Sequence, residues 1–269
     1  MEAVDAAPQQ DAITLSKSEV AHAARLDKAF KRIGYELEDV RGGTADVPPV
    51  LLDRVPQDIR NMPDAEARKE VFQELLLPQI LVINAEIARD RARLVDILGR
   101  KARHSAVRPR DEAWLADLAE RYGTSPRDHG SLMARVDQIP PSLALAQAAI
   151  ETGWGTSTLA RRSQNLFGQI AAGSDNGMRR FDTLNEAVRA YVHNLNTGAT
   201  YAEFRRARAK ARHAGRPLDG HALAGTLQGY SEAGRNYVSA LRALIRNNDM
   251  ADFDQARLSR QLRGGPAPT

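Results

Sequence analysis

The sequence of 269 residues predicts a mainly α-helical protein. Apolar residues recur at helical spacing between Pro63 and Gly99. An alanine-rich run from Ser142 to Thr152 lies between prolines and glycines, which favour the start and the end of a helix respectively. Strand signals are short and confined to 167–171 and 178–181, which a turn sequence joins.

The N-terminal part is expected to form a helical region over 18–110. Residues 1–17 are small, polar and proline-containing, which is typical of a flexible leader. Residues 18–40 carry apolar side chains at approximately helical spacing, with Ser18 as a possible cap. The long apolar stripe that ends at Gly99 is expected to be kinked or divided at Pro78.

A second region is expected over 111–250, followed by a C-terminal tail over 251–269. A helix over 111–122 and a connecting segment precede the alanine-rich helix. Thr183 and Glu186 have the spacing of a capping box for a helix that ends near Leu195. Further helices are expected around 200–213, 219–229 and 234–247.

Glu151 lies in the closing turn of the alanine-rich helix, which has no clear polar face and is therefore expected to be buried on all sides. Desolvation and the partial negative charge at a helix C-terminus both disfavour an ionised carboxyl, so the pKa of Glu151 should be raised. A glycosidase needs such a protonated acid to donate a proton to the leaving oxygen. The alternative is a structural glutamate that reaches solvent or an arginine.

The composition restricts the possible partners and chemistry. A net charge of +4 and a pI near 9.5 favour a negatively charged partner, such as peptidoglycan or nucleic acid. The basic stretch from Arg205 to Arg212 is expected to be a solvated helix face, because it lacks the aromatic platform of a nucleic-acid site. The chain has no cysteine, and its six histidines lack paired spacing, so we expect no metal and no cofactor.

No integral membrane segment is expected, because no apolar run reaches the roughly 18 residues that a membrane span needs. Leu75 to Leu77, for example, are followed by Pro78 and Gln79. The N-terminus has neither the basic start nor the apolar stretch of a secretory signal.

Two motifs carry a resemblance to a known family. The run from Pro141 to Gly155, followed by Asn165-Leu166-Phe167-Gly168-Gln169, resembles the Bax/FlgJ-type N-acetylglucosaminidases of glycoside hydrolase family 73, and the similarity extends over about 47–257. This resemblance implies a lysozyme-like catalytic domain with a short β-hairpin lobe, and Glu151 as its general acid. The implied reaction is hydrolysis of the β-1,4 bond between N-acetylglucosamine and N-acetylmuramic acid in peptidoglycan glycan strands, in the periplasm or cell envelope.

Several residues near the motifs are candidates for substrate binding, each with a structural alternative. Gln147 is one turn before Glu151 and either orients the acid, touches a sugar or is a satisfied core residue. Aromatic residues, Tyr191 among them, could stack on sugars or form the wall beneath the site. The full set of candidates is Gln147, Trp154, Asn165, Phe167, Gln169, Tyr230 and Tyr237.

For the second catalytic group the sequence offers more than one candidate. Most glycosidases use two carboxyl groups, and the second is proposed to lie on a hairpin in related enzymes. Here the corresponding segment, 169–180, is short, and Asp175 is its only acid. Asp175, Glu232 and the 2-acetamido group of the substrate all remain open. Two other functions also remain open: a lytic transglycosylase that uses the same glutamate, and a catalytically impaired peptidoglycan-binding or scaffold module.

Overall fold

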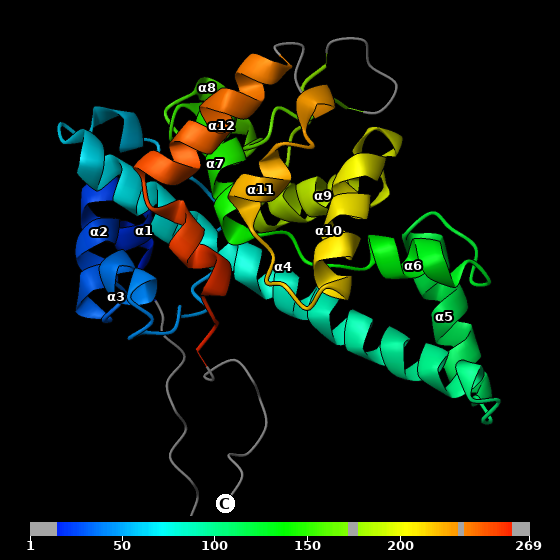
Figure 1. Cartoon of the computed structure of the whole chain (residues 1–269). Coiled ribbons are helices and arrows are strands. Elements are labelled where there is room, and N and C mark those ends of the chain that lie inside the picture. The colour runs from blue at the N-terminus through cyan, green and yellow to red at the C-terminus, as the bar shows by residue number, and fades with distance from the viewer. Residues whose placement is uncertain (1–14, 172–176, 231–233, 260–269) are drawn as a thin grey trace, which may run out of the picture.

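The computed structural model describes residues 15–171, 177–230 and 234–259, and these residues form a mainly helical protein, as predicted (Figure 1). A long helix, α4, runs diagonally through the molecule, and α7 lies against it near the centre (Figure 1). In chain order, with η for a 3-10 helix, the elements are α1 (Lys17–Ala21), α2 (Ala23–Arg32), α3 (Leu37–Arg41), η1 (Ile59–Asn61), α4 (Ala65–Ala102), α5 (Pro109–Arg121), α6 (His129–Arg135), α7 (Pro141–Thr152), α8 (Thr158–Ser163), α9 (Leu184–Thr197), η2 (Ala199–Tyr201), α10 (Ala202–His213), α11 (Gly220–Ala224), η3 (Gln228–Tyr230), α12 (Arg235–Asn247) and η4 (Met250–Gln255).

Most of the residues with helical spacing over 18–40 are helical, but the chain forms the three short helices α1, α2 and α3 there and not one continuous helix. His22 adopts an extended conformation between α1 and α2. Gly34, with φ of 70°, turns the chain after α2 through the left-handed region that glycine adopts readily. The cap is also displaced by two residues, since Ser16 and Glu19 form the capping box. Helical spacing alone did not reveal these breaks.

The helix α4 begins at the cap Asp64 and continues through Pro78 without a break, so, of the kink or division expected there, the division is wrong. A proline inside a helix removes one backbone hydrogen bond and costs about 3 kcal/mol. Every residue from Val71 to Leu81 is buried. We attribute the continuity of α4 to this packing, which offsets the local cost of the proline.

Within the described ranges, α4 is the one helix that is long and apolar enough to cross a membrane. The sequence had not indicated such a segment. However, 78% of its most apolar window is buried inside the protein, as in the core helix of a globular domain.

The helix α7 is the centre of the C-terminal part. It packs against α4, α11, α12 and η4, and every residue from Pro141 to Ala149 is buried, as its composition predicts. Gly153, with φ of 57°, ends the helix in the left-handed conformation, and its N–H donates to the carbonyl oxygen of Ala149. The sequence therefore located both ends of this helix closely.

The expected β-hairpin lobe is not established by the described residues. They contain an isolated antiparallel bridge between Ile170 and Met178. Two backbone hydrogen bonds accompany it, from Ala171 N to Gly177 O at 2.7 Å and from Arg179 N to Gln169 O at 2.8 Å. The turn that would complete a hairpin lies within 172–176, outside the described residues.

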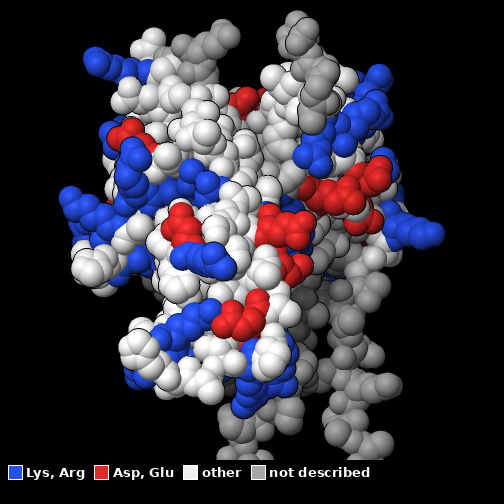
Figure 2. All heavy atoms as spheres, turned by 90° about the vertical axis from the view of Figure 1, so that its right-hand side faces the viewer, with Lys and Arg blue, Asp and Glu red and all other residues white. Residues whose placement is uncertain are grey.

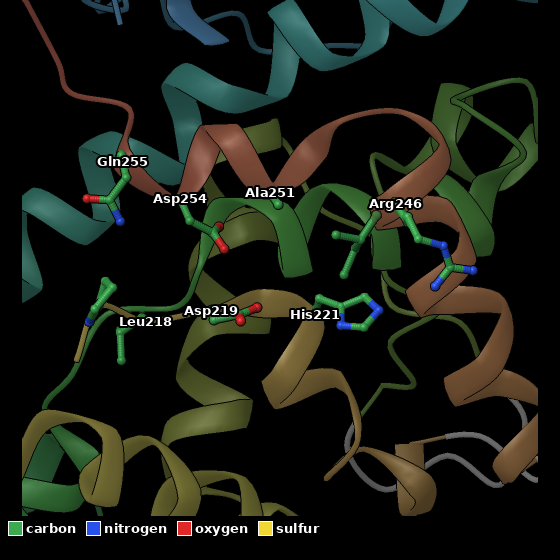
Figure 3. Close-up of a pocket in the computed structure, with 9 residues that line it drawn as sticks. Leu218, Asp219, His221, Arg246, Ala251, Asp254 and Gln255 are labelled. Atoms are coloured by element: carbon green, nitrogen blue, oxygen red, sulfur yellow. The ribbon is translucent and has the colours of Figure 1, made fainter. Parts of the chain in front are cut away.

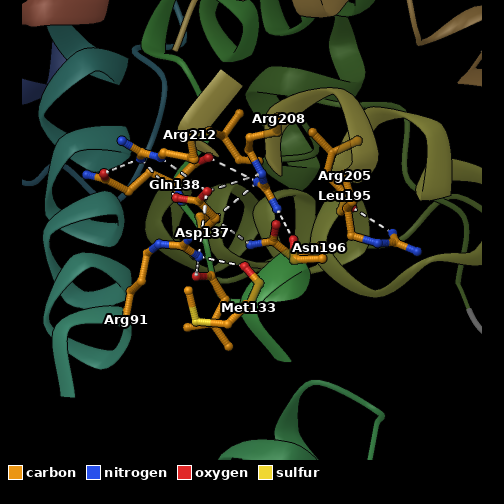
Figure 4. A network of polar contacts seen from close by, with 12 residues as sticks. Arg91, Met133, Asp137, Gln138, Leu195, Asn196, Arg205, Arg208 and Arg212 are labelled. Atoms are coloured by element: carbon orange, nitrogen blue, oxygen red, sulfur yellow. Dashed lines mark hydrogen bonds and ion pairs between the residues drawn. The ribbon is translucent and has the colours of Figure 1, made fainter. Parts of the chain in front are cut away.

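The basic stretch in α10 is not a uniformly solvated face, so this expectation is wrong for several of its arginines. Arg205 and Arg208 are buried, and Arg212 donates to the Asp137 carboxylate at 2.9 Å (Figure 4). On the face shown in Figure 2, basic and acidic side chains are interspersed. Arginine stems are long enough to pack in the interior while their guanidinium groups bind backbone carbonyls, which composition alone does not reveal.

Glu74 is a buried acid in α4, 3% exposed, with one carboxyl oxygen that has no hydrogen-bond partner among the described residues. Burial raises its pKa to about 8, and the nearby carboxylates of Asp27 and Glu70 add to this shift, while Lys31 opposes it. The folded state therefore holds the Glu74 proton more tightly than the unfolded state does.

We predict that the free energy of unfolding falls by roughly 1 kcal/mol between pH 7 and pH 9 as Glu74 ionises. The stabilisation is complete below the ordinary pKa of a glutamate and is lost as the pH rises through about 8. Urea unfolding at several pH values should show this fall of the free energy of unfolding with pH in the wild type and not in Glu74→Gln. Glu66→Gln, at an exposed position of the same helix, is the control. An unchanged slope in Glu74→Gln would contradict the prediction.

Candidate active site

Glu151 lies in the last turn of α7, where it is half-buried. Burial raises the pKa of its carboxyl, and a hydrogen-bonding interaction with the Tyr237 hydroxyl partly opposes this rise. The partial negative charge at the C-terminus of α7 also favours the protonated form. Among the described residues no lysine or arginine pairs with Glu151. The geometry therefore suits an acid that keeps its proton to a higher pH than a free glutamate.

Asn165 holds the segment 165–169 beside Glu151. Its buried side chain donates to the carbonyl oxygens of Gln169 at 2.7 Å and Arg179 at 2.9 Å, and accepts from the N–H of Gln169 at 2.9 Å. Gly168, with φ of 63°, lies so close to the acid that a Cβ there would be 3.0 Å from Glu151 Oε2. The role that the structure shows for Asn165 is thus to shape the loop that contacts Glu151.

Two of the candidate tyrosines, Tyr230 and Tyr237, lie at the same place. The Tyr230 hydroxyl donates to the carbonyl oxygen of Phe167 at 2.9 Å, and the Tyr230 ring stacks on the Tyr237 ring with centroids 5.5 Å apart. Tyr201, which sequence reasoning missed, is a neighbour of Tyr230, and the centroids of the two rings are 6.0 Å apart. No motif or spacing links Tyr201 to the others, because only the fold brings η2 and η3 together.

Other candidate residues form the support beneath the site. Gln147 is fully buried and hydrogen-bonded to two tyrosines, and Phe167 stacks on the buried Tyr191 with centroids 3.9 Å apart. Gln169 is half-buried and its side chain donates to Ala187 O. The structure thus places Gln147, Phe167 and Tyr191 where they shape the site from within the core.

Trp154 follows Glu151 in the glycine-rich turn and has a φ of 60°, which is uncommon for a residue other than glycine. Its half-buried ring packs edge-on against the ring of Phe72, with centroids 6.1 Å apart. The ammonium group of Lys69 lies over the Trp154 ring. Trp154 therefore anchors the turn to α4.

The two acids considered as the second catalytic group, Asp175 and Glu232, lie outside the described residues. In the part of the chain that the structure describes, no group of three or more histidine or acidic side chains is arranged to hold a metal ion.

A pocket of about 480 Å³ lies near the opposite end of α7 (Figure 3). There the Asp254 carboxylate accepts from the backbone N–H and the hydroxyl of Ser142, at 2.9 and 2.8 Å, and from Gly220 N at 2.9 Å. Burial raises the pKa of Asp254 to about 6. Ser142 and Glu151 are separated by roughly 14 Å of helix. Asp254 connects the starts of α7 and α11, and this pocket is separate from the candidate active site.

Comparison with known proteins identifies relatives of this chain. The family described as mannosyl-glycoprotein endo-beta-N-acetylglucosaminidase matches residues 129–250, which include Glu151 and both motifs. The protein named bax of Escherichia coli (strain K12) is 36% identical over 205 residues, covering 71% of this chain and 73% of its own. No solved structure matches. This degree of identity over most of both proteins, together with the family match, shows that the chain belongs to the Bax-like glucosaminidases.

Proposed function

We propose that the protein is a peptidoglycan hydrolase, an endo-β-N-acetylglucosaminidase that cleaves the β-1,4 bond between N-acetylglucosamine and N-acetylmuramic acid. The observation that supports this proposal most is the setting of Glu151: a half-buried acid at a helix C-terminus, with a raised pKa, no cationic partner among the described residues and a tyrosine hydroxyl beside it. The Bax-like relationship supports the choice of glycan substrate.

In the proposed reaction Glu151 transfers its proton to the glycosidic oxygen as the bond to C1 of N-acetylglucosamine breaks. Water then supplies a hydroxyl group to C1 and a proton that restores Glu151. The positive charge that develops at C1 needs a second group, for which we retain Asp175, Glu232 and the 2-acetamido group of the substrate. The loop passes so close to the acid at Gly168 that it limits where the Glu151 carboxyl can lie.

We further propose that the substrate lies across the surface formed by Glu151, the loop 165–169 and the aromatic residues Tyr230 and Tyr237. The stacking of these two tyrosines and the hydrogen bond from Tyr230 to Phe167 O connect the aromatic residues to the loop. Peptidoglycan glycan strands are the proposed partner, and the periplasm or cell envelope the proposed location.

The experiment is digestion of purified peptidoglycan followed by mass spectrometry of the soluble products. The proposal expects products with a reducing N-acetylglucosamine end. Products with 1,6-anhydro ends instead would identify a lytic transglycosylase. Retention of the protein on insoluble peptidoglycan without released sugar would identify an impaired binding module. Either of these results would overturn the proposed hydrolysis.

Gly168→Ala is predicted to reduce cleavage at least about tenfold, because a small displacement of a catalytic group is costly. An added methyl group would lie against the Glu151 carboxyl, and the φ of 63° would be strained. Initial rates of glycan release should show the loss. Gly215→Ala, also at positive φ but with open space around the added carbon, is the control for backbone strain. Equal rates in the two variants would contradict the prediction.

A further inference from the structure

The carboxyl of Glu151 lies at the end of a line of buried polar groups that passes through three helices. Gln147 in α7 is 0% exposed, and its amide lies between two tyrosine hydroxyls. The Tyr191 hydroxyl, from α9, donates to Gln147 Oε1 at 2.7 Å. Gln147 Nε2 donates to the Tyr237 hydroxyl oxygen, from α12, at 3.0 Å. Glu151 is one turn after Gln147 on the same face of α7, so the Tyr237 hydroxyl that accepts from Gln147 also lies beside the Glu151 carboxyl and interacts with it.

Counting hydrogens gives this line a direction. An amide oxygen only accepts and an amide nitrogen only donates, whereas a tyrosine hydroxyl has a single hydrogen to donate. Tyr191 uses its hydrogen on Gln147, and Tyr237 receives one from Gln147. The hydrogen of Tyr237 therefore remains for Glu151, and every group in the line donates toward the acid.

The opposite direction is disfavoured by Tyr191. If the amide of Gln147 were turned over, its nitrogen would donate to Tyr191, whose own hydrogen would then need another acceptor. Tyr191 is 1% exposed, and within the described ranges its hydroxyl has no other hydrogen-bond partner. A buried hydroxyl without an acceptor is costly, so Tyr191 fixes the orientation of the amide.

We propose that Tyr191 and Gln147 are positioning residues that make Tyr237 a permanent hydrogen-bond donor to Glu151, so that the transferable proton resides on the carboxyl oxygen that does not face Tyr237. This inference rests on the proposed function, since it assigns a site to the proton that the reaction uses. In the reversed arrangement Glu151 would donate its proton to the Tyr237 oxygen and hold it away from a substrate.

The inference predicts a change in pH dependence as well as in rate. Tyr237 lowers the pKa of Glu151 by donating to it, against the larger effect of burial. Without the Tyr191 hydroxyl, Gln147 is free to turn and accept the hydrogen of Tyr237, so the pKa of Glu151 should rise. If Tyr191 only packed the core, its replacement by phenylalanine would not change the pKa of Glu151.

The test compares the full-length wild type with Tyr191→Phe, which keeps the ring that stacks on Phe167. We expect a roughly 2- to 10-fold lower kcat, an unchanged KM, and a basic limb of the pH–rate profile that moves upward by about 0.5 to 1 pH unit. Tyr35→Phe is the matched control. It also removes a buried tyrosine hydroxyl, and that hydroxyl, in the N-terminal part of the chain, has no hydrogen-bond partner within the described ranges. Its profile should match the wild type.

Gln147→Met is a second variant that breaks both bonds of the line. It should move the pH limb in the same direction, and adding Tyr191→Phe to it should have little further effect, because both residues act through one line. If Gln147→Met does not fold, Tyr191→Phe alone decides.

A titration of the carboxyl carbons by 13C NMR separates this inference from the proposed function, since it needs no activity. The resonance that is missing in Glu151→Gln identifies Glu151. A higher Glu151 pKa in Tyr191→Phe supports the line even if the wild type cleaves nothing, in which case the proposed function alone fails. A cleaving wild type with an unchanged pKa and profile in Tyr191→Phe overturns the inference.

Discussion

Glu151→Gln is expected to lower the rate of peptidoglycan cleavage by about 10²–10⁴-fold, the usual contribution of a general acid. The substitution keeps the shape of the side chain and its ability to accept from Tyr237, but it removes the transferable proton. The wild type should also lose activity as the pH rises through the raised pKa of Glu151, because only the protonated acid is competent. The release of reducing sugar from purified peptidoglycan, measured across pH, checks both expectations.

The control for this variant is Glu186→Gln. Glu186 lies in the first turn of α9, where its carboxylate accepts from the backbone N–H of Asp182 at 3.0 Å. Glu186 has no part in the proposed reaction, and Glu186→Gln makes the same chemical change as Glu151→Gln. Both variants should keep the circular dichroism spectrum of the wild type. A Glu151→Gln protein that cleaves peptidoglycan at the rate of Glu186→Gln would contradict a general-acid role.

The sequence was informative where local rules decide the structure. Pro140 and Pro141 at the start of α7 and Gly153 after it define that helix, and its alanine-rich interior implies burial, so the raised pKa of Glu151 followed from local sequence. Thr183 likewise caps α9 by accepting from Glu186 N, as its spacing predicts, whereas the Glu186 carboxylate accepts from Asp182 N and so does not complete the expected capping box. The family assignment also followed from these segments, because the motifs are contiguous.

The parts that the sequence did not reveal depend on tertiary contacts. The continuity of α4 through Pro78 depends on neighbours that pack on both sides of it. The line from Tyr191 through Gln147 to Tyr237 joins three helices that are far apart in sequence. The lysozyme-like character of the catalytic part and the domain limits at residues 18, 111 and 250 stay predictions.

The clearest example of tertiary context is Asp137, which is 1% exposed and lies among arginines from two helices (Figure 4). Arg212 donates to its carboxylate at 2.9 Å, while Arg91 and Arg208 are within 3.7 and 3.8 Å of it. Arg208 is itself fully buried, and its guanidinium donates to the carbonyl oxygens of Ala134, Asp137 and Gln138. Burial lowers the pKa of Arg208 to about 10, which shows how unfavourable this setting is for a cation without an anion nearby.

Asp137→Asn is therefore expected to lower the free energy of unfolding by about 3–5 kcal/mol, the usual cost of leaving a buried charge without its partner. The asparagine nearly preserves the shape, so the loss would report charge rather than packing. Urea unfolding at neutral pH gives the measurement. Asp117→Asn removes an exposed carboxylate that pairs with Arg121, and should change stability by less than about 1 kcal/mol. If the two variants were equally stable, the arginines around Asp137 would not depend on its charge, and the hydrogen bonds of Arg208 to backbone carbonyls would have to stabilise it unaided.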